Sequence, residues 1–220
     1  MLPTPEQLLQ AYANGYFPMA LSRDDPELYW FSPEERGVLP LERFHLPRGL
    51  KRAMKSCPYR VTVDTDFMAV IHACGAVTPT RRETWINSTI IELYGALFAS
   101  GHAHSIEVWQ EDALVGGLYG ISLGGAFFGE SMFSRAPDAS KIALVHLVER
   151  LRAAGYTLLD TQYVNDHLKQ FGVEAWPKED YMTKLAKALR ASPNPSTRFS
   201  TVSVRSGAAS SSSVSNTRPS

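Results

Sequence analysis

"HSIEVWQEDALVGGLYGISLGGAFFGESMF", residues 104–133, contains runs of strand-forming residues separated by two turn signals, Glu111-Asp112 and Gly124-Gly125. This pattern predicts three or four antiparallel strands joined by tight turns. The glycines at positions 116, 117 and 120 would weaken a strand unless another group must approach its backbone closely. The segment therefore predicts an antiparallel meander that something else in the molecule, or a ligand, approaches at short range.

Helical segments surround this meander. Residues 65–75 end at Gly75 as a helix ends at its C-cap, and residues 87–101 begin with Thr89 followed three positions later by Glu92. After the meander, the pattern predicts an amphipathic helix over 136–155, a buried strand over 156–162 and a last helix over 177–190. The order predicts an α+β fold with a mainly antiparallel mixed sheet flanked by helices.

Composition divides the chain into three parts. Residues 1–60 are punctuated by Pro and carry short helical pieces, which predicts a small N-terminal domain. Residues 61–191 alternate clear helices and strands and form the larger domain. Residues 192–220 are rich in Ser and short of large apolar side chains, so they cannot bury enough surface to offset their ordering entropy and are expected to form a disordered tail.

The overall charge and the cysteines limit the class of protein. The 220 residues include 22 Lys+Arg and 22 Asp+Glu, so the formal net charge is zero and a nucleic-acid site must be a local basic patch. Cys57 and Cys74 form no CxxC pattern, which fits a reducing cytosol rather than a disulfide framework or a zinc site. No segment resembles a signal peptide or a membrane span, so we expect a cytoplasmic protein.

Asp160 and Gln162 lie two residues apart at the end of the predicted strand, so their side chains are expected to face the same way. Gln162 would then bond a reacting carbonyl or amine, while Asp160 would fix the amide or take a proton. The alternative is a polar pair that caps a neighbouring loop. His167 follows closely, but no Ser or Cys lies in a nucleophile context such as GxSxG.

Glu130 lies between Phe127-Phe128 and Met132-Phe133, where an unpaired charge would be costly. Either the strand turns this carboxylate to water, or the aromatic groups line a pocket that uses it. His102 and His104 would share one face of a strand but lack a third ligand at a helpful spacing, so no metal site is expected.

A basic stripe is predicted on one helix face, because four cationic residues follow at i, i+3, i+4 and i+7: Arg48, Lys51, Arg52 and Lys55. Such a stripe suits a phosphate backbone, although a solvated helix face is the ordinary alternative. Trp85 lies next to a helix start and is either part of the core or a platform on which a base stacks.

Seven blocks of sequence carry a family resemblance. They are "ANGYFPMA" at 13–20, "YWFSPEERGVLP" at 29–40, "TWI" at 84–86, "GHAHSIEVWQEDALVGGLYG" at 101–120, "GESMFSR" at 129–135, "ASK" at 139–141 and "DTQYVNDH" at 160–167. These blocks resemble the bacterial leucyl/phenylalanyl-tRNA–protein transferases, the aminoacyltransferases of the N-degron pathway. The resemblance runs to about residue 182 and leaves only the Ser-rich tail outside it.

The resemblance implies a small N-terminal domain on a domain like those of the GNAT acyltransferases. It implies Leu-tRNA or Phe-tRNA as donor, Met-tRNA as a weaker donor, and an acceptor protein that begins with Arg or Lys. Coenzyme A is not expected, because "FSRAPDASK" occupies the place of the glycine-rich pyrophosphate loop. No other cofactor or metal is indicated.

The resemblance also implies roles for individual residues. Phe127 and Glu130 would belong to the pocket for the donor's Leu or Phe side chain, Trp85 would stack on the terminal adenosine, and the 48–55 stripe would contact the tRNA backbone. Gln162, oriented by Asp160, would position the attacking amine or polarise the ester carbonyl. A rival within the family routes the proton through the donor's ribose 2′-hydroxyl and leaves Asp160 mainly structural.

One further question and two other classes stay open at this point. Either Glu130 or Asp160 could supply charge to the acceptor's cationic side chain. A GNAT-like acyl-CoA-dependent N-acyltransferase would share the meander but require coenzyme A. A non-catalytic tRNA-binding module would use the stripe and Trp85 but would give no reason for Asp160 beside Gln162.

Overall fold

The structure, a computed structural model, describes residues 3–78 and 82–194 together with the backbone of residues 204–205. The first half of the chain forms α1 (Pro5–Ala13), β1 (Phe17–Met19), β2 (Tyr29–Phe31), β3 (Glu35–Val38), a 3-10 helix η1 (Leu41–Arg43), α2 (Arg48–Ser56), β4 (Tyr59–Val63), α3 (Phe67–Cys74) and α4 (Ser88–Ala99). The second half forms β5 (Ala103–Gln110), β6 (Ala113–Leu123), β7 (Ala126–Ser134), α5 (Ala139–Ala154), β8 (Leu158–Gln162), α6 (Asp166–Lys169), β9 (Glu174–Pro177), α7 (Lys178–Leu189) and β10 (Val204–Arg205).

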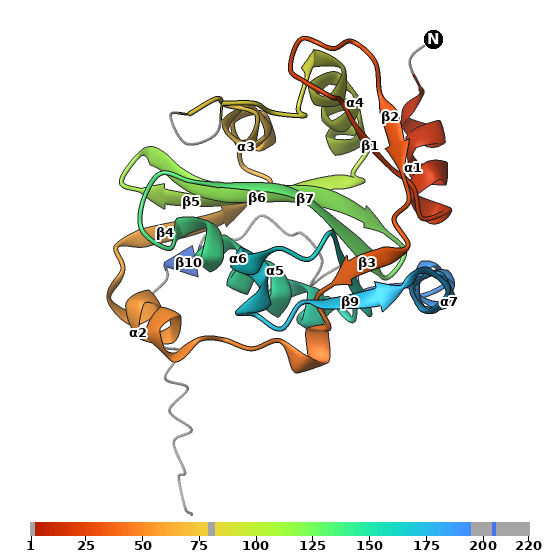
Figure 1. The fold of residues 1–220 in the computed structure, drawn as a ribbon. Coiled ribbons are helices and arrows are strands. Elements are labelled where there is room, and N and C mark those ends of the chain that lie inside the picture. Colours follow the sequence, from red (N-terminus) through yellow and green to blue (C-terminus); the bar gives the residue numbers. More distant parts are fainter. Residues whose placement is uncertain (1–2, 79–81, 195–203, 206–220) are drawn as a thin grey trace, which may run out of the picture.

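One large sheet runs through the middle of the molecule, with helices on both faces (Figure 1). Its strand order is β10-β4-β5-β6-β7-β8-β3-β9, while β1 and β2 pair as a separate two-stranded sheet. All described pairs in the large sheet are antiparallel except β7 with β8, which α5 connects as a crossover helix. The predicted mixed, mainly antiparallel sheet flanked by helices is confirmed.

Two apolar clusters lie on opposite faces of this sheet. One face carries α3 and α4, with α1 beside α4, and the other carries α5, with α2 packed beyond it (Figure 1). Gly116 allows the close packing of α5, because a Cβ at this glycine would lie 2.5 Å from the Cβ of Ala139. This is the close approach to the strand backbone that the glycines predict.

The predicted meander is confirmed as β5, β6 and β7, with turns at Glu111-Asp112 and Gly124-Gly125. The predicted helices are also present, and Gly155 ends α5 in the left-handed region. One cap differs from the prediction: Asn87, rather than Thr89, caps α4 by accepting a hydrogen bond from the main-chain N–H of Ile90.

A β-bulge interrupts the pairing of β6 with β7. Tyr119 is opposite Ser131 and Gly120 is opposite Gly129, so Glu130 is the extra residue on β7. A bulge breaks the two-residue alternation of side chains and can re-aim one of them. Glu130 therefore has neither of the orientations that a regular strand would give it.

A second irregularity lies on the neighbouring strand. Val38 is opposite Asp160 and Gly37 is opposite Gln162, so Thr161 is the extra residue on β8. The parallel pairing of β7 with β8 ends at Phe128 and Asp160, one to two residues before these irregularities. The two strands separate there, at the level of Glu130 and Thr161.

The sequence-based division of the chain near residue 60 stays a prediction. Strand β3 lies on the N-terminal side of that boundary yet pairs with β8 and β9 inside the large sheet. Most of the predicted tail, 195–203 and 206–220, lies outside the described residues. Within the described residues, no helix has the length and apolar character needed to cross a membrane.

Candidate active site

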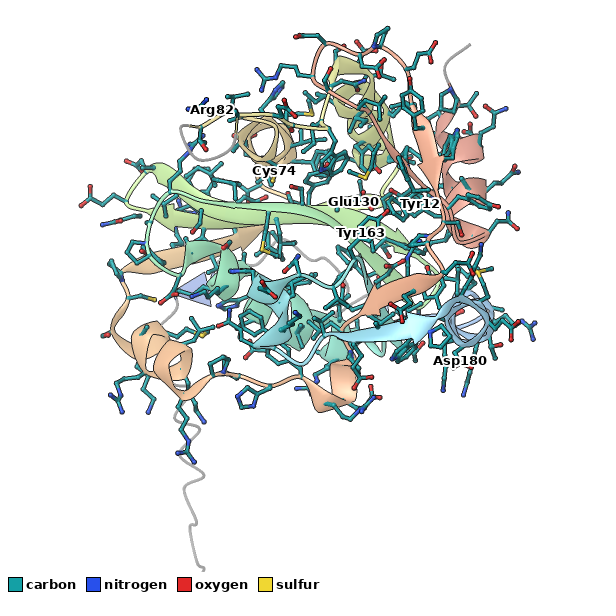
Figure 2. The ribbon with its side chains drawn as sticks, in the orientation of Figure 1. Tyr12, Cys74, Arg82, Glu130, Tyr163 and Asp180 are labelled. Atoms are coloured by element: carbon teal, nitrogen blue, oxygen red, sulfur yellow. The ribbon has the colours of Figure 1, made fainter. Side chains whose placement is uncertain are left out.

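Glu130 lies at the centre of a hydrogen-bond network where the two parallel strands separate. Tyr12 of α1 donates to its Oε1 at 2.8 Å, and Tyr94 of α4 donates to its Oε2 at 3.0 Å. The two tyrosine hydroxyl oxygens also lie next to each other. The Gln162 amide donates to Oε1 at 3.3 Å. Figure 2 shows Tyr12, Glu130 and Tyr163 in one region, where the sheet meets the N-terminal helix.

Burial raises the pKa of Glu130 to about 8, even though the hydrogen bonds from Tyr12 and Tyr94 act to lower it. The nearby charge of Asp160 also raises this pKa. Burial is the main cause that raises the pKa of both tyrosine hydroxyls, followed by the charge of Glu130. Near neutral pH the site therefore holds a carboxyl group that is poised to gain or lose a proton.

Glu130 should make the folded protein less stable as the pH rises. Between its ordinary pKa of 4.5 and its folded value of about 8 the folded state binds an extra proton, so stability falls with pH by about 1.4 kcal/mol per unit. Glu130→Gln should remove this slope. Unfolding curves in denaturant at pH 5 and pH 8 measure it for both proteins. Parallel pH dependence in the two proteins would show that Glu130 titrates normally.

The carboxylate of Asp160 forms a buried ion pair that the sequence does not predict. Its carboxylate accepts hydrogen bonds from Arg36, with Nε 3.0 Å from each oxygen and Nη2 2.8 Å from Oδ2. Tyr181 of α7 donates to Oδ2 at 2.7 Å. The side chains of Asp160 and Arg36 are 0% and 1% exposed, so this is a fully buried ion pair.

Gln162 is held by Asp160, but through its main chain. Its main-chain N–H donates to Oδ1 of Asp160 at 2.8 Å, while its side-chain amide turns to Glu130. Gln162 has φ +56°, in the left-handed region that non-glycine residues seldom adopt. With the bulge at Thr161, this conformation breaks the alternation on which the same-face expectation depends.

Two cavities meet at this network. The larger has a volume of about 400 Å³, and its lining includes apolar side chains from β6, β7, β8, α5 and α6: Leu118, Met132, Leu144, Leu147, Leu159 and Leu168. Polar side chains, among them Ser140, Asn165 and His167, complete the lining. The smaller has a volume of about 180 Å³, and its lining includes Phe17, Met19, Trp85 and Tyr163. Four residues line both: Glu130, Thr161, Gln162 and Asn165.

A family model described as "Leucyl/phenylalanyl-tRNA protein transferase" matches residues 38–186, and the model of that family's N-terminal domain matches residues 1–34. Together they span nearly all of the described chain. The chain belongs to the leucyl/phenylalanyl-tRNA–protein transferase family. It is therefore an aminoacyl-tRNA–protein transferase, and the resemblance seen in the sequence blocks is confirmed.

Relatives named leucyl/phenylalanyl-tRNA–protein transferase cover most of the chain. One from Paramagnetospirillum magneticum is 58% identical over 186 residues, which is 84% of this chain and 89% of the relative. Others from Maricaulis maris and Caulobacter vibrioides are 54% and 58% identical, over 84% of this chain and 85% and 86% of their own length. A solved structure of "L-PGS from Bacillus licheniformis" aligns with a TM-score of 0.43 and 13% identity over 84% of this chain and 70% of its own.

Of the site residues predicted for this transferase, Glu130, Gln162 and Trp85 come together, since all three line the smaller cavity. Asp160 lies directly behind Gln162. Phe127 is fully buried and is not among the residues that line either cavity, although it shares a core cluster with leucines of the larger one. Phe127 therefore contributes to that cavity only through its neighbours.

The basic stripe lies on α2 (Figure 1), and none of its residues lines either of the two cavities. Leu50 of this helix is buried, whereas the four cationic side chains are exposed: Arg48, Lys51, Arg52 and Lys55. Within the described part of the chain, none of these four side chains forms an ion pair with an acidic residue. The stripe is thus free to meet an external anion.

Sequence reasoning missed several groups of the transferase site. Tyr12, Tyr94, Arg36 and Tyr181 come from four separate elements, and no local pattern marks them. Thr161 was also missed: its Oγ1 is buried and, among the described residues, has no hydrogen-bond partner, while Thr161 lines both cavities. A buried hydroxyl without a partner is costly, so a substrate atom is a natural partner for it.

The sequence predicts no metal site at His102 and His104. His104 bonds Asp64 through Nδ1 at 2.7 Å. Among residues 3–78 and 82–194, no three His, Cys, Asp or Glu side chains are grouped so that they could hold a metal ion.

Proposed function

We propose that the protein transfers Leu or Phe, and Met less efficiently, from aminoacyl-tRNA to the N-terminal α-amine of proteins that begin with Arg or Lys. The product would be marked for degradation by the N-end rule pathway. The observation that carries this proposal is a carboxyl group, Glu130, at the junction of a cavity lined by several leucines and a second cavity lined by Trp85. Since the donor is an aminoacyl-tRNA, we expect the reaction to take place in the cytoplasm.

The larger cavity suits the side chain of the donor's amino acid. Its leucines and Met132 offer apolar contacts without charge, as small-ligand sites usually do. Leu, Phe and Met are all unbranched at Cβ, so a narrow entry would admit them and exclude Val and Ile. Such a pocket separates similar apolar shapes by only about 1–3 kcal/mol per methylene, so overlapping donor specificity is expected.

The smaller cavity suits the terminal adenosine of the donor. Trp85 is half-buried there and offers a surface on which a base can stack. With the amino-acid side chain in one cavity and the adenosine in the other, the ester carbonyl lies at their junction. Glu130, Thr161 and Gln162 then surround the reacting atoms.

Glu130, rather than Asp160, is the group for the acceptor. Arg36, Tyr181 and the Gln162 main chain already occupy the Asp160 carboxylate, which has no exposed surface. Glu130 lines both cavities and can meet the cationic side chain or the α-amine of the acceptor. Its raised pKa of about 8 falls when a cation binds beside it, which favours the carboxylate in the complex.

The reaction is an aminolysis. The neutral α-amine attacks the ester carbonyl, a tetrahedral oxyanion forms, and the 3′-oxygen of the ribose leaves with a proton. An α-amine titrates near 7.7–8.0, so a sizeable neutral fraction already exists at about neutral pH and strong base catalysis is not required. The Gln162 amide would orient the amine or polarise the carbonyl, and the ribose 2′-hydroxyl is the competing route for the proton.

We also propose that the larger part of the fold is of the GNAT type. The parallel strands β7 and β8 separate beside the site, and α5 connects them. Coenzyme A remains disfavoured as donor, because residues 135–138 between β7 and α5 lack glycine. A non-catalytic tRNA-binding module would not explain the network around Glu130.

The decisive experiment is transfer of labelled Phe from Phe-tRNA to two peptides that differ only in their first residue, Arg or Ala. Label on the Arg peptide alone is the expected result and would establish donor, acceptor and reaction together. Label on neither peptide, with the protein folded, would refute the proposal, and coenzyme A esters would be tested next.

The basic stripe on α2 should contact tRNA phosphates. Replacing Arg48, Lys51 and Arg52 by Ala should weaken tRNA binding and reduce the slope of log Kd against log salt by about 0.7–0.9 per lost contact. The matched control replaces three exposed cations of the last helix and its end, Lys184, Lys187 and Arg190, by Ala. Equal salt slopes in the wild type and the α2 variant would remove the stripe from the interface.

A further inference from the structure

The guanidinium group of Arg36 connects Asp160 of β8 with the end of α1, and both elements contribute to the network around Glu130. Arg36 bonds the Asp160 carboxylate through Nε and Nη2, and its Nη1 donates to the carbonyl of Gly15 at 3.0 Å. Gly15 follows the end of α1, the helix that carries Tyr12. The guanidinium carbon of Arg36 lies over two rings, at 4.5 Å from the centroid of Phe17 and 4.8 Å from that of Tyr181.

The buried ion pair of Arg36 with Asp160 is not explained by a gain in stability alone. Moving two charges out of water carries a desolvation penalty, so an apolar pair of similar size often stabilises a core as well or better. Burial acts to lower the pKa of Arg36, but the charge and hydrogen bonds of Asp160 outweigh it, so the pKa is raised. The guanidinium group therefore stays charged beside Asp160 and holds that carboxylate in one orientation.

The orientation of Asp160 matters because Gln162 depends on it. The left-handed conformation of Gln162, with φ +56°, is held by the bond from its main-chain N–H to Oδ1 of Asp160. That conformation turns the Gln162 amide toward Glu130. Tyr181 fixes the other oxygen, Oδ2, from α7.

We propose that Arg36 and Tyr181 are positioning residues, which act through Asp160 to hold the Gln162 amide at the junction of the two cavities. Arg36 also holds the end of α1, and so the hydroxyl that Tyr12 donates to Glu130. This inference rests on the proposed function for its effect on rate. It gives Asp160 a structural task, since its lone pairs are already occupied by five hydrogen bonds.

Tyr181→Phe is the variant that tests the inference with least risk to folding. It keeps the ring beside Arg36 and removes one hydroxyl that donates to Asp160. The single-turnover rate of Phe transfer, at saturating Phe-tRNA and Arg peptide, should fall about tenfold, because small misplacements of reacting groups are costly. The Kd for Phe-tRNA should not change.

Tyr156→Phe is the matched control. Its hydroxyl is also buried and bonds Ser122 at 2.6 Å, but Tyr156 lines neither cavity. A merely structural role for Tyr181 would give equal rates in the two variants and only a lower Tm, which would overturn the inference. In a Gln162→Ala background, adding Tyr181→Phe should cost nothing more in rate. A further tenfold loss there would show that Tyr181 does not act through Gln162.

A second readout does not depend on transfer. The side-chain amide signal of Gln162 in an NMR spectrum of ¹⁵N-labelled protein is identified by its absence in Gln162→Ala. This signal should shift in Tyr181→Phe and stay in place in Tyr156→Phe, and an unmoved signal in Tyr181→Phe would overturn the inference. A wild-type protein that transfers no Phe would instead refute the proposed function, while the NMR result still decides the positioning role.

Discussion

Replacing Asp160 by Ala should lower the free energy of unfolding by about 3–5 kcal/mol, because it leaves the Arg36 guanidinium buried without its counter-charge. Arg36 is 1% exposed and cannot turn to water without disturbing the rings of Phe17 and Tyr181 that it contacts. A domain of this size is stable by only about 5–15 kcal/mol, so the loss would be a large part of the total.

Urea unfolding followed by circular dichroism measures this effect. Asp166→Ala is the control, because Asp166 also pairs with a cation, Lys169, but on the surface, where its removal should change little. A double variant with Arg36→Met and Asp160→Leu should recover part of the lost stability, since it removes both charges together. A loss below about 1 kcal/mol in Asp160→Ala would contradict the buried ion pair.

The same residue bears on the mechanism. Asp160→Asn keeps the size of the side chain, and its single-turnover rate can be measured on folded protein. A loss of less than about tenfold would be too small for a general base, which typically contributes 10²–10⁴-fold. Because weaker positioning of Gln162 should by itself cost about tenfold, as in Tyr181→Phe, we expect Asp160→Asn to lose about tenfold and not the further 10²–10⁴-fold of a lost general base.

Met132→Trp should reduce Phe transfer by about 10- to 100-fold, because the indole would occupy the larger cavity. Burying an apolar side chain contributes about 1.5–3 kcal/mol, and each 1.4 kcal/mol corresponds to tenfold in kcat/KM for the donor. Met132 lines this cavity and is only partly buried, so the larger side chain can enter the cavity without breaking the core.

Steady-state transfer from Phe-tRNA and from Leu-tRNA to an Arg peptide measures the effect. Met68→Trp is the matched control, because Met68 is 40% exposed on α3 and its Trp variant should keep the wild-type kcat/KM. If Met132→Trp transferred both amino acids as fast as the wild type, the larger cavity would not be the amino-acid pocket.

Much of the fold could be predicted because local signals agree with one another. The paired turns of the meander, the glycine at the end of α5 and the apolar stripe of that helix each mark an element by short-range chemistry. Strand β3 is different. Its four residues gain a place in the sheet only by pairing with β8 and β9, more than 100 positions later in the chain. No local pattern could indicate that pairing.

The candidate site divides in the same way. Glu130 stands out in the sequence because a carboxylate amid aromatic residues needs an explanation, and its tyrosine partners supply one. The bulges at Glu130 and Thr161 could not be predicted, since each depends on the register with a neighbouring strand. The expectation that Asp160 and Gln162 face the same way assumes a regular strand, and the bulge at Thr161 interrupts that regularity. Asp160 instead accepts a hydrogen bond from the main-chain N–H of Gln162.

The contacts around Glu130 and Asp160 have a consequence for how the protein is made. The network needs Tyr12 near the start of the chain and Tyr181 near the end of its described part. Synthesis proceeds from the N-terminus, so α1 leaves the ribosome long before its partners exist. An unfinished chain lacks the α7 contact to Asp160, and the full network forms only after α7 is made. We therefore expect nascent chains that still lack α7 not to hold Asp160 and Gln162 in the geometry of the finished protein.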